Sequence, residues 1–162
     1  MSKFVSNTSP ILYLSKIGLI DTIYLPPESF IIPNGVKEEI LAGAVDDAAK
    51  EWISSSNNKI QIVTVPIRSE ILAWDLGKGE TEVLSYLLSN EGAIGIIDDL
   101  NARRCAQIYH LPVIGTIGLL LNSKKKNQIV SLKETFIKLK EAGFYIEKNL
   151  LEKLLIEVNE NY

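Results

Sequence analysis

Carboxylate and amide side chains are the groups in this sequence that could carry chemistry. Three or four of them around a wet pocket would suit a hard divalent cation, Mg²⁺ or Mn²⁺, because such ions prefer oxygen ligands and retain waters. A bound ion of this kind can activate water and stabilise the leaving oxygen in phosphodiester hydrolysis. The candidates are Asn7, Glu38, Glu39, Glu80, Glu82, Asp98 and Asp99.

Other catalytic chemistries are poorly supplied. Cys105 is the only cysteine and His110 the only histidine, so an internal disulfide and a Cys/His zinc site are both excluded. A Ser-His-Asp triad would need His110, which is better explained as a partly buried residue between a helix and a strand. The net charge of −3 does not favour nucleic-acid binding, although bound divalent cations can offset acidic residues locally.

Apolar segments with strand-like patterns alternate with amphipathic helical segments along the chain. A turn is predicted at residues 6–10, between the first strand and the first helix. This alternation predicts an α/β fold: a three-layer α/β/α sandwich with a parallel sheet, for which we expect the strand order 3-2-1-4-5. The expected strands cover residues 4–5, 30–33, 60–65, 93–97 and 112–115. The expected helices cover residues 11–17, 36–41, 46–54 and 99–109, with others beginning at 79 and at 116, where Thr116 is a candidate cap.

Parallel strands bring several candidate residues to one edge, because ligands of such sheets bind beyond the carboxyl ends of the strands. Each candidate also has an ordinary structural explanation, such as a carboxylate in a first helical turn or Asp99 as a helix N-cap. Residues two apart on a helix point in nearly opposite directions, so only one of Glu80 and Glu82 should face the cleft. Asp98 is likewise a stronger candidate than Asp99.

The end of the chain has a different pattern. Ser131 and Glu134 form a capping box before apolar residues at helical spacing, and Asn149 and Glu152 repeat the arrangement. We therefore expect an α/β domain at residues 1–125 and a helical extension at residues 126–162, packed on the same domain. The two amphipathic helices could cover the sheet or offer a groove to a partner helix, and core packing is favoured.

Two further features bear on location and on ligands. No apolar run reaches the roughly 20 residues that a membrane-spanning helix needs, and Met1-Ser2-Lys3-Phe4 enters directly into a strand-like segment without a signal-peptide pattern. The chain is therefore interpreted as cytoplasmic. Arg103 and Arg104 are candidates for phosphate contacts, although Arg104 could instead pair with an acid, and the lysines at 124–126 fit a solvated helix end.

Four passages carry a family resemblance: residues 5–11, 32–40, 79–83 and 96–99, the last followed by Arg103. In these passages the sequence resembles the PIN-domain family, ribonuclease-like proteins that include many toxins of toxin–antitoxin pairs. The tail beyond residues 115–118 is similar to a helical extension of unknown function in one PIN subgroup, so the resemblance spans nearly the whole chain. Each motif is weak alone, and their order and spacing are moderately specific together.

The resemblance implies a Mg²⁺- or Mn²⁺-dependent endoribonuclease, often dimeric and often inhibited by a small antitoxin. It places the catalytic and metal-binding groups at Asn7, Glu39, Glu80 and Asp98. Asp99 is a further metal-ligand candidate, Glu82 and Glu38 are second choices, Ser9 and Thr116 are polar supports, and Arg103 and Arg104 are candidate RNA contacts.

Asn7 stands where the family normally has aspartate. An amide can donate a carbonyl oxygen to a metal but brings no negative charge, so we expect weaker metal binding and reduced or absent cleavage. The alternative is a catalytically weak or inactive PIN-like module that binds RNA or a protein through the same cleft. A phospho-acceptor receiver domain fits poorly, because its acidic pair would follow the first strand.

Overall fold

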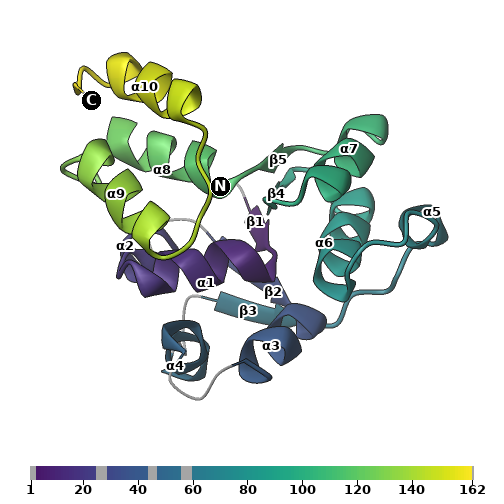
Figure 1. The fold of residues 1–162 in the computed structure, drawn as a ribbon. Helices are drawn as coiled ribbons and strands as arrows, with labels where there is room; N and C mark the ends of the chain where they lie inside the picture. The colour runs from purple at the N-terminus through teal and green to yellow at the C-terminus, as the bar shows by residue number, and fades with distance from the viewer. Residues whose placement is uncertain (1–2, 25–28, 44–46, 56–59, 162) are drawn as a thin grey trace.

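A computed structural model of the protein describes residues 3–24, 29–43, 47–55 and 60–161, in which strands and helices alternate (Figure 1). The strands are β1 (Lys3–Ser6), β2 (Ser29–Pro33), β3 (Ile60–Val63), β4 (Ala93–Ile96) and β5 (Val113–Ile114). The helices are α1 (Thr8–Lys16), α2 (Ile20–Tyr24), α3 (Asn34–Leu41), α4 (Ala48–Ser55), α5 (Ser69–Leu72), α6 (Lys78–Ser89), α7 (Leu100–Ile108), α8 (Thr116–Lys125), α9 (Leu132–Glu141) and α10 (Lys148–Glu157).

The five strands form one parallel sheet in the order β3-β2-β1-β4-β5, which confirms the predicted fold class and strand order. The central strand β1 pairs with β2 and with β4, so that Val5 lies opposite Ile31 and Ser6 opposite Ile96. Because all strands run in the same direction, their carboxyl ends lie at one edge. The loops that follow β1 and β4 are therefore neighbours in space.

Helices cover both faces of the sheet. Figure 1 shows α1, α8 and α9 on one side of the strands and α6 and α7 on the other. Strand residues such as Val5, Ile32 and Ile96 are almost completely buried, as continuous apolar strands covered on both faces should be. Gly95 of β4 lets α6 pack closely, because a Cβ atom there would lie 2.8 Å from the side chain of Leu87.

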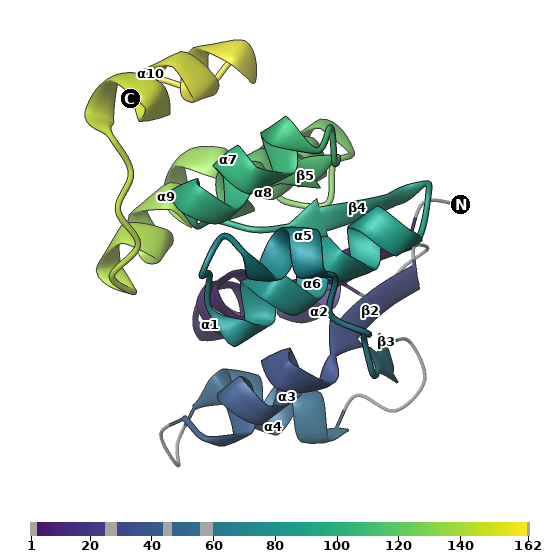
Figure 2. The ribbon, with the colours of Figure 1, turned by 90° about the vertical axis from the view of Figure 1, so that its right-hand side faces the viewer.

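The last two helices bury their apolar faces. Leu132, Phe136 and Leu139 of α9 are fully buried, and so is Leu155 of α10. All four belong to the same hydrophobic cluster as the sheet. An extended segment joins α9 to α10, which lies on the outer side of α8 (Figure 2).

The first residue of a helix was harder to predict than the presence of the helix. The turn predicted at residues 6–10 is wrong: α1 begins at Thr8 with Asn7 in the N-cap position. Pro10 is accommodated in the first helical turn because the backbone N–H groups there have no partner within the helix. The N-terminal limit of α4 cannot be compared with the predicted start at residue 46, which lies outside the described residues.

Two predicted caps are also wrong, and one is confirmed. Thr116 is the first residue of α8 rather than its cap, since its hydroxyl binds Asp98. Helix α10 begins at Lys148 and has no side-chain cap, so Asn149 does not cap it. The hydroxyl of Ser131 does accept a 3.1 Å hydrogen bond from the backbone N–H of Glu134.

Helix length explains what the apolar pattern missed. Helices α2 and α5 contain five and four residues, too few for a periodic pattern to be recognised. Helix α6, with 12 residues, is the longest in the part of the chain that the structure describes. None of the described helices is both long and apolar enough to cross a membrane.

Candidate functional site

The carboxyl ends of β1 and β4 bring Asn7 and Asp98 to the same edge of the sheet. The backbone N–H of Asn7 donates a 3.0 Å hydrogen bond to the carbonyl oxygen of Ile96, which continues the pairing of β1 with β4 beyond the strands. Asn7 is only 3% exposed. It occupies the N-cap position of α1, yet its side chain makes no capping hydrogen bond. The amide group is therefore directed away from α1.

The side chain of Asn7 meets carboxylates from α3 and α6. Its Nδ2 donates a 2.8 Å hydrogen bond to Oε1 of Glu80. Glu39 is held nearby by the backbone N–H of Gly79, which donates to its Oε1 at 3.1 Å, and by the hydroxyl of Thr8, which donates to its Oε2. Three segments far apart in the chain thus bring one amide and two carboxylates around the start of α6.

Two glycines make this approach of the side chains compatible with the backbone. A Cβ atom at Gly79 would overlap Oδ1 of Asn7 and lie 3.2 Å from Oε2 of Glu39. A Cβ atom at Gly77 would overlap Oε2 of Glu80. From the sequence, Gly79 could be recognised only as the start of a helix. Its role in making room for the oxygen atoms is visible only in the structure.

The Oδ1 atom of Asn7 is buried and has no hydrogen-bond partner among the described residues. Leaving such an oxygen unpaired costs about 1–3 kcal/mol, so its presence calls for an explanation. An amide oxygen beside the carboxylates of Glu39 and Glu80 is a set of donors of the type that Mg²⁺ and Mn²⁺ bind. The donor chemistry at this point therefore fits a hard divalent cation.

Asp98 is held by a different neighbour. Both of its carboxylate oxygens accept hydrogen bonds from Thr116, at 2.7 Å from the backbone N–H and 2.6 Å from the hydroxyl. Within the described residues, no group of three or more histidine, cysteine, aspartate or glutamate residues is placed to hold a metal ion. Glu39 and Glu80 lie by Asn7, and Asp98 lies by Thr116. The meeting of Glu39, Glu80 and Asp98 around one ion stays a prediction.

Glu82 points to another element than Glu80. Its Oε2 accepts a 2.7 Å hydrogen bond from the backbone N–H of Gly35 in the first turn of α3, and the residue is 7% exposed. Burial raises the pKa of the Glu82 carboxyl, an effect partly offset by the Gly35 hydrogen bond and by the charge of Lys78. Glu82 thus joins the start of α3 to α6.

The remaining acidic candidates also have partners of their own. Glu38 forms an exposed ion pair with Lys78 at 2.5 Å. Asp99 caps α7 by accepting a 2.9 Å hydrogen bond from the backbone N–H of Ala102, as its ordinary structural explanation predicted.

The other predicted polar and basic residues lie on α1 and α7. Ser9 is half-buried in the first turn of α1. Arg103 and Arg104 are exposed on α7, and Nη1 of Arg104 donates to Oδ1 of Asn101 at 3.5 Å. Arg103 lies next to Asp98: a Cβ atom at Gly115 would be 2.5 Å from Nη1 of Arg103 and 3.1 Å from Oδ1 of Asp98.

Two buried hydroxyl groups, of Ser6 and Tyr24, form a hydrogen-bonded chain to the backbone of Asn7, and this chain was not predicted. The hydroxyl of Ser6 donates a 3.0 Å hydrogen bond to the carbonyl oxygen of Asn7. The hydroxyl of Tyr24 lies 2.7 Å from the same Ser6 oxygen, and because Ser6 uses its proton for Asn7, Tyr24 is the donor. Burial raises the pKa of Tyr24, which stays protonated. A lone tyrosine in a one-turn helix gives no sequence signal for this role.

A groove opens beside Asp98 and runs towards the C-terminal helices. Its volume is about 490 Å³. Asp98 and Arg103 are among its lining residues, and Phe144, Leu150 and Leu154 belong to its apolar wall. Residues of the candidate site and residues of the C-terminal extension therefore line the same groove.

Comparison with known protein families agrees with this fold. The chain matches a family model described as a PIN domain over residues 3–160, a range that includes both α9 and α10. No curated protein matches the chain at a significant level. A parallel sheet in the order 3-2-1-4-5 with acidic residues at its carboxyl edge, together with a family match over nearly the whole chain, establishes that this protein belongs to the PIN-domain family.

Proposed function

We propose that this protein is a metal-dependent endoribonuclease and the toxin component of a toxin–antitoxin pair. Membership of the PIN-domain family supports a nuclease-type module in general. The observation that carries the proposal further is the buried, unpaired Oδ1 atom of Asn7 beside the carboxylates of Glu39 and Glu80. Oxygen atoms arranged in this way suit a hard divalent cation at the edge where parallel sheets bind their ligands.

The proposed reaction adds water across a phosphodiester bond, breaking one P–O bond and leaving a phosphate end and a hydroxyl end. Asn7, Glu39 and Glu80 would hold Mg²⁺ or Mn²⁺, with Asp98 and Asp99 as the further candidate ligands. Such an ion lowers the pKa of a bound water and neutralises charge on the leaving oxygen.

The protein's own groups would fix the carboxylates in place. Thr8 and the backbone N–H of Gly79 orient Glu39, and Thr116 orients Asp98. Carboxylates oriented by hydrogen bonds of this kind bind cations better than freely rotating ones.

RNA is the substrate in this proposal, and exposed Arg103 and Arg104 on α7 are its candidate phosphate contacts. Arginine suits this role because its planar guanidinium can bind phosphate through two hydrogen bonds. A small antitoxin protein as inhibitor and a homodimer complete the proposal, and these two parts rest on the family resemblance. A cytoplasmic location is also proposed, and it rests on the sequence patterns alone.

A second candidate function is a catalytically weak or inactive PIN-like module that binds RNA or a protein through the same cleft. Two contacts favour it. The Nδ2 group of Asn7 already pairs with Glu80, and both oxygens of Asp98 are occupied by Thr116. With Asn7 uncharged, the site has one negative charge fewer than an aspartate at that position would give, and its attraction for a cation is correspondingly weaker.

Cleavage of a labelled single-stranded RNA in Mn²⁺ tests the proposal. We expect weak cleavage by the wild type, a reduction of roughly tenfold or more in Glu39→Gln and Glu80→Gln, and an increase in Asn7→Asp. Glu91→Gln is the matched control, because Glu91 is an exposed carboxylate before β4, at the opposite edge of the sheet. Cleavage that survives both glutamate substitutions would refute the assigned site. RNA binding without cleavage, in the wild type and in Asn7→Asp alike, would favour the second candidate.

A further inference from the structure

The groove beside Asp98 is built jointly by the α/β body and by the C-terminal extension. Asp98, Arg103 and Ile117 contribute the wall from the body, and Phe144, Leu150 and Leu154 contribute the wall from the segment before α10 and from α10 itself. Part of one wall of this groove therefore depends on the position of α10.

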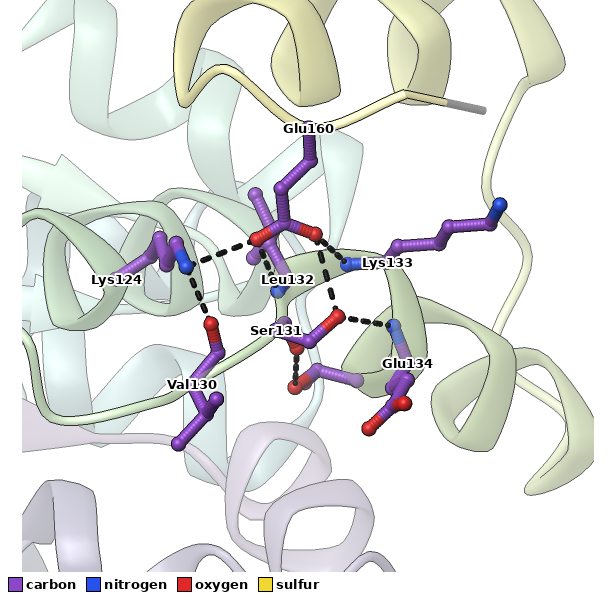
Figure 3. Close-up of polar contacts among 8 residues, drawn as sticks. Lys124, Val130, Ser131, Leu132, Lys133, Glu134 and Glu160 are labelled. Carbon is purple, nitrogen blue, oxygen red and sulfur yellow. Dashed lines mark hydrogen bonds and ion pairs between the residues drawn. The ribbon is translucent and has the colours of Figure 1, made fainter.

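One carboxylate holds the end of α10 in place. Glu160 accepts 2.8 Å hydrogen bonds from the backbone N–H groups of Leu132 and Lys133 at the start of α9, and a 3.2 Å hydrogen bond from the hydroxyl of Ser131 (Figure 3). It also pairs with Lys124 of α8 at 3.0 Å. We call these contacts the Glu160 clasp.

The clasp is electrostatically strong. Partial burial alone would raise the pKa of Glu160, but the two backbone N–H groups and the ammonium of Lys124 together lower it to about 2. A carboxylate at a helix N-terminus also interacts favourably with the helix dipole. The Glu160 clasp is therefore charged and closed at neutral pH.

Apart from the clasp, α10 is held by apolar contacts on one face and by an ion pair at the surface. Leu151 and Leu155 are buried, but Leu150 is 42% exposed and Ile156 is 73% exposed. The segment that precedes α10 begins at Gly143, whose φ of +99° favours glycine. An ion pair between Lys125 and Glu157 joins α8 to α10 at the surface. The clasp is thus the main polar attachment of this helix among the described residues.

The groove is lined by one cation, Arg103, and one carboxylate, Asp98, among apolar residues. Arg103 is exposed, and its guanidinium forms no hydrogen bond or ion pair with the described residues. An unpaired guanidinium beside an apolar wall matches a nucleotide, whose phosphate is anionic and whose base has apolar faces. The Asp98 carboxylate lies next to this cation, but both of its oxygens accept hydrogen bonds from Thr116.

We propose that the groove holds one nucleotide of a single-stranded RNA, with its phosphate on Arg103 and its base against Leu150 and Leu154, and that Glu160 is the positioning residue that keeps this wall in place. The inference rests on the proposed function, because it assumes that RNA is the ligand. It assigns the C-terminal extension a role in substrate binding.

Paired substitutions on α10 test the occupant of the groove. Leu150→Asp places a negative charge in the groove, and Ile156→Asp places the same charge on the same helix at a more exposed position outside it. The measurement is fluorescence anisotropy of a labelled single-stranded oligoribonucleotide, with Ca²⁺ in place of Mg²⁺ to suppress cleavage. We expect Kd to rise roughly tenfold for Leu150→Asp and to stay unchanged for Ile156→Asp.

A second pair tests the clasp. Glu160→Gln removes the charge from the clasp, and the control Glu157→Gln breaks only the ion pair with Lys125. We expect faster hydrogen exchange in residues 144–158 and weaker RNA binding for Glu160→Gln, at temperatures where circular dichroism shows both variants folded. Faster exchange with unchanged RNA affinity would reduce the clasp to a purely structural role and overturn the proposal.

The outcomes separate this inference from the proposed function. Wild type that binds RNA, together with equal RNA affinity of the two aspartate variants, would overturn the groove assignment alone. Wild type that fails to bind RNA would overturn both. Binding of a leucine-rich amphipathic peptide that Leu150→Asp abolishes, with RNA affinity unaffected, would assign the groove to a protein ligand and also overturn the inference.

Discussion

The amide nitrogen of Asn7 donates a 2.8 Å hydrogen bond to Oε1 of Glu80, while the amide oxygen of the same residue remains buried and unpaired. The nitrogen and the oxygen of the Asn7 amide therefore have different roles. The nitrogen compensates the charge of a neighbouring carboxylate, and the oxygen remains as a donor. An aspartate in its place could do only the second.

Asn7→Asp should make the stability of the protein depend on divalent cations. The substitution replaces a hydrogen-bond donor by a second negative charge beside Glu80, so we expect the metal-free variant to unfold more easily, by about 1–3 kcal/mol. Binding of Mg²⁺ or Mn²⁺ to the folded state should restore the loss. Thermal unfolding in EDTA and across a metal titration measures both effects. An identical metal-induced shift for wild type and variant would contradict this account.

Gly79→Ala should destabilise the protein, although glycine to alanine within a helix ordinarily stabilises it by about 0.5–1 kcal/mol. The added Cβ atom would overlap Oδ1 of Asn7 and crowd Oε2 of Glu39. Urea unfolding of Asn7→Ala, Gly79→Ala and the double variant forms a double-mutant cycle. We expect the double variant to be more stable than the sum of the single effects, because the overlapping oxygen is gone. Simple additivity would show that the two residues are not in contact.

Glu82→Gln should be at least as stable as the wild type at neutral pH. The pKa of Glu82 is raised in the folded state, so its contribution to stability is fully present below the unfolded-state pKa and is lost as pH rises through the folded-state pKa. Glutamine keeps an acceptor for the Gly35 N–H and has no charge to bury. The advantage of Glu82→Gln over the wild type should therefore grow as the pH rises from the unfolded-state pKa and level off above the folded-state pKa.

Glu82→Ala is the contrasting variant. It leaves the buried N–H of Gly35 without a partner, which costs about 1–3 kcal/mol. Chemical unfolding of the two variants and the wild type over a pH series distinguishes the effects. Equal losses of stability for glutamine and alanine at neutral pH would show that the charge of Glu82, rather than its hydrogen bond, is what the fold requires.

The Glu160 clasp should open in acid. Its pKa is lowered to about 2, so the stability it contributes is present above the unfolded-state value of about 4.3 and is lost as pH falls towards 2. Hydrogen exchange of residues 144–158 over this pH range should show progressive loss of protection, relative to β1 and β4. Glu160→Gln should remove the pH dependence. Uniform loss of protection across the whole molecule would indicate global unfolding instead.

The fold was accessible from the sequence because its signals are repeated and mutually consistent. The apolar run at residues 93–97 indicated a strand covered on both faces, and the alternation of elements required parallel pairing. The same logic placed Asn7 and Asp98 at one edge, and the structure has them there. Two features were missed. Helices α2 and α5 are too short to show a periodic pattern. The hydrogen bonds from Tyr24 to Ser6 and from Ser6 to Asn7 depend on packing between distant segments.

The site was less predictable than the fold because hydrogen-bond partners compete locally. Thr116 was expected to cap α8, but its hydroxyl has a charged acceptor in Asp98, and hydrogen bonds to charged groups are stronger than those to neutral ones. The placement of Glu82 against α3 follows from the packing of α3 against α6, which no local pattern reveals. Residue types indicated which side chains could take part in catalysis or metal binding. Packing determined which of these side chains already have hydrogen-bond partners within the protein.

The central place of β1 also bears on how the protein forms during synthesis. Strand β1 is made before the other strands of this sheet, and it pairs on one side with β2 but on the other with β4, which emerges much later. Until then one edge of β1 has no partner, and Asn7 has neither Glu80 nor the backbone of Ile96 to bind. Because domains complete their non-local contacts only when the required segments have been made, the nascent chain should lack an assembled site through most of its translation.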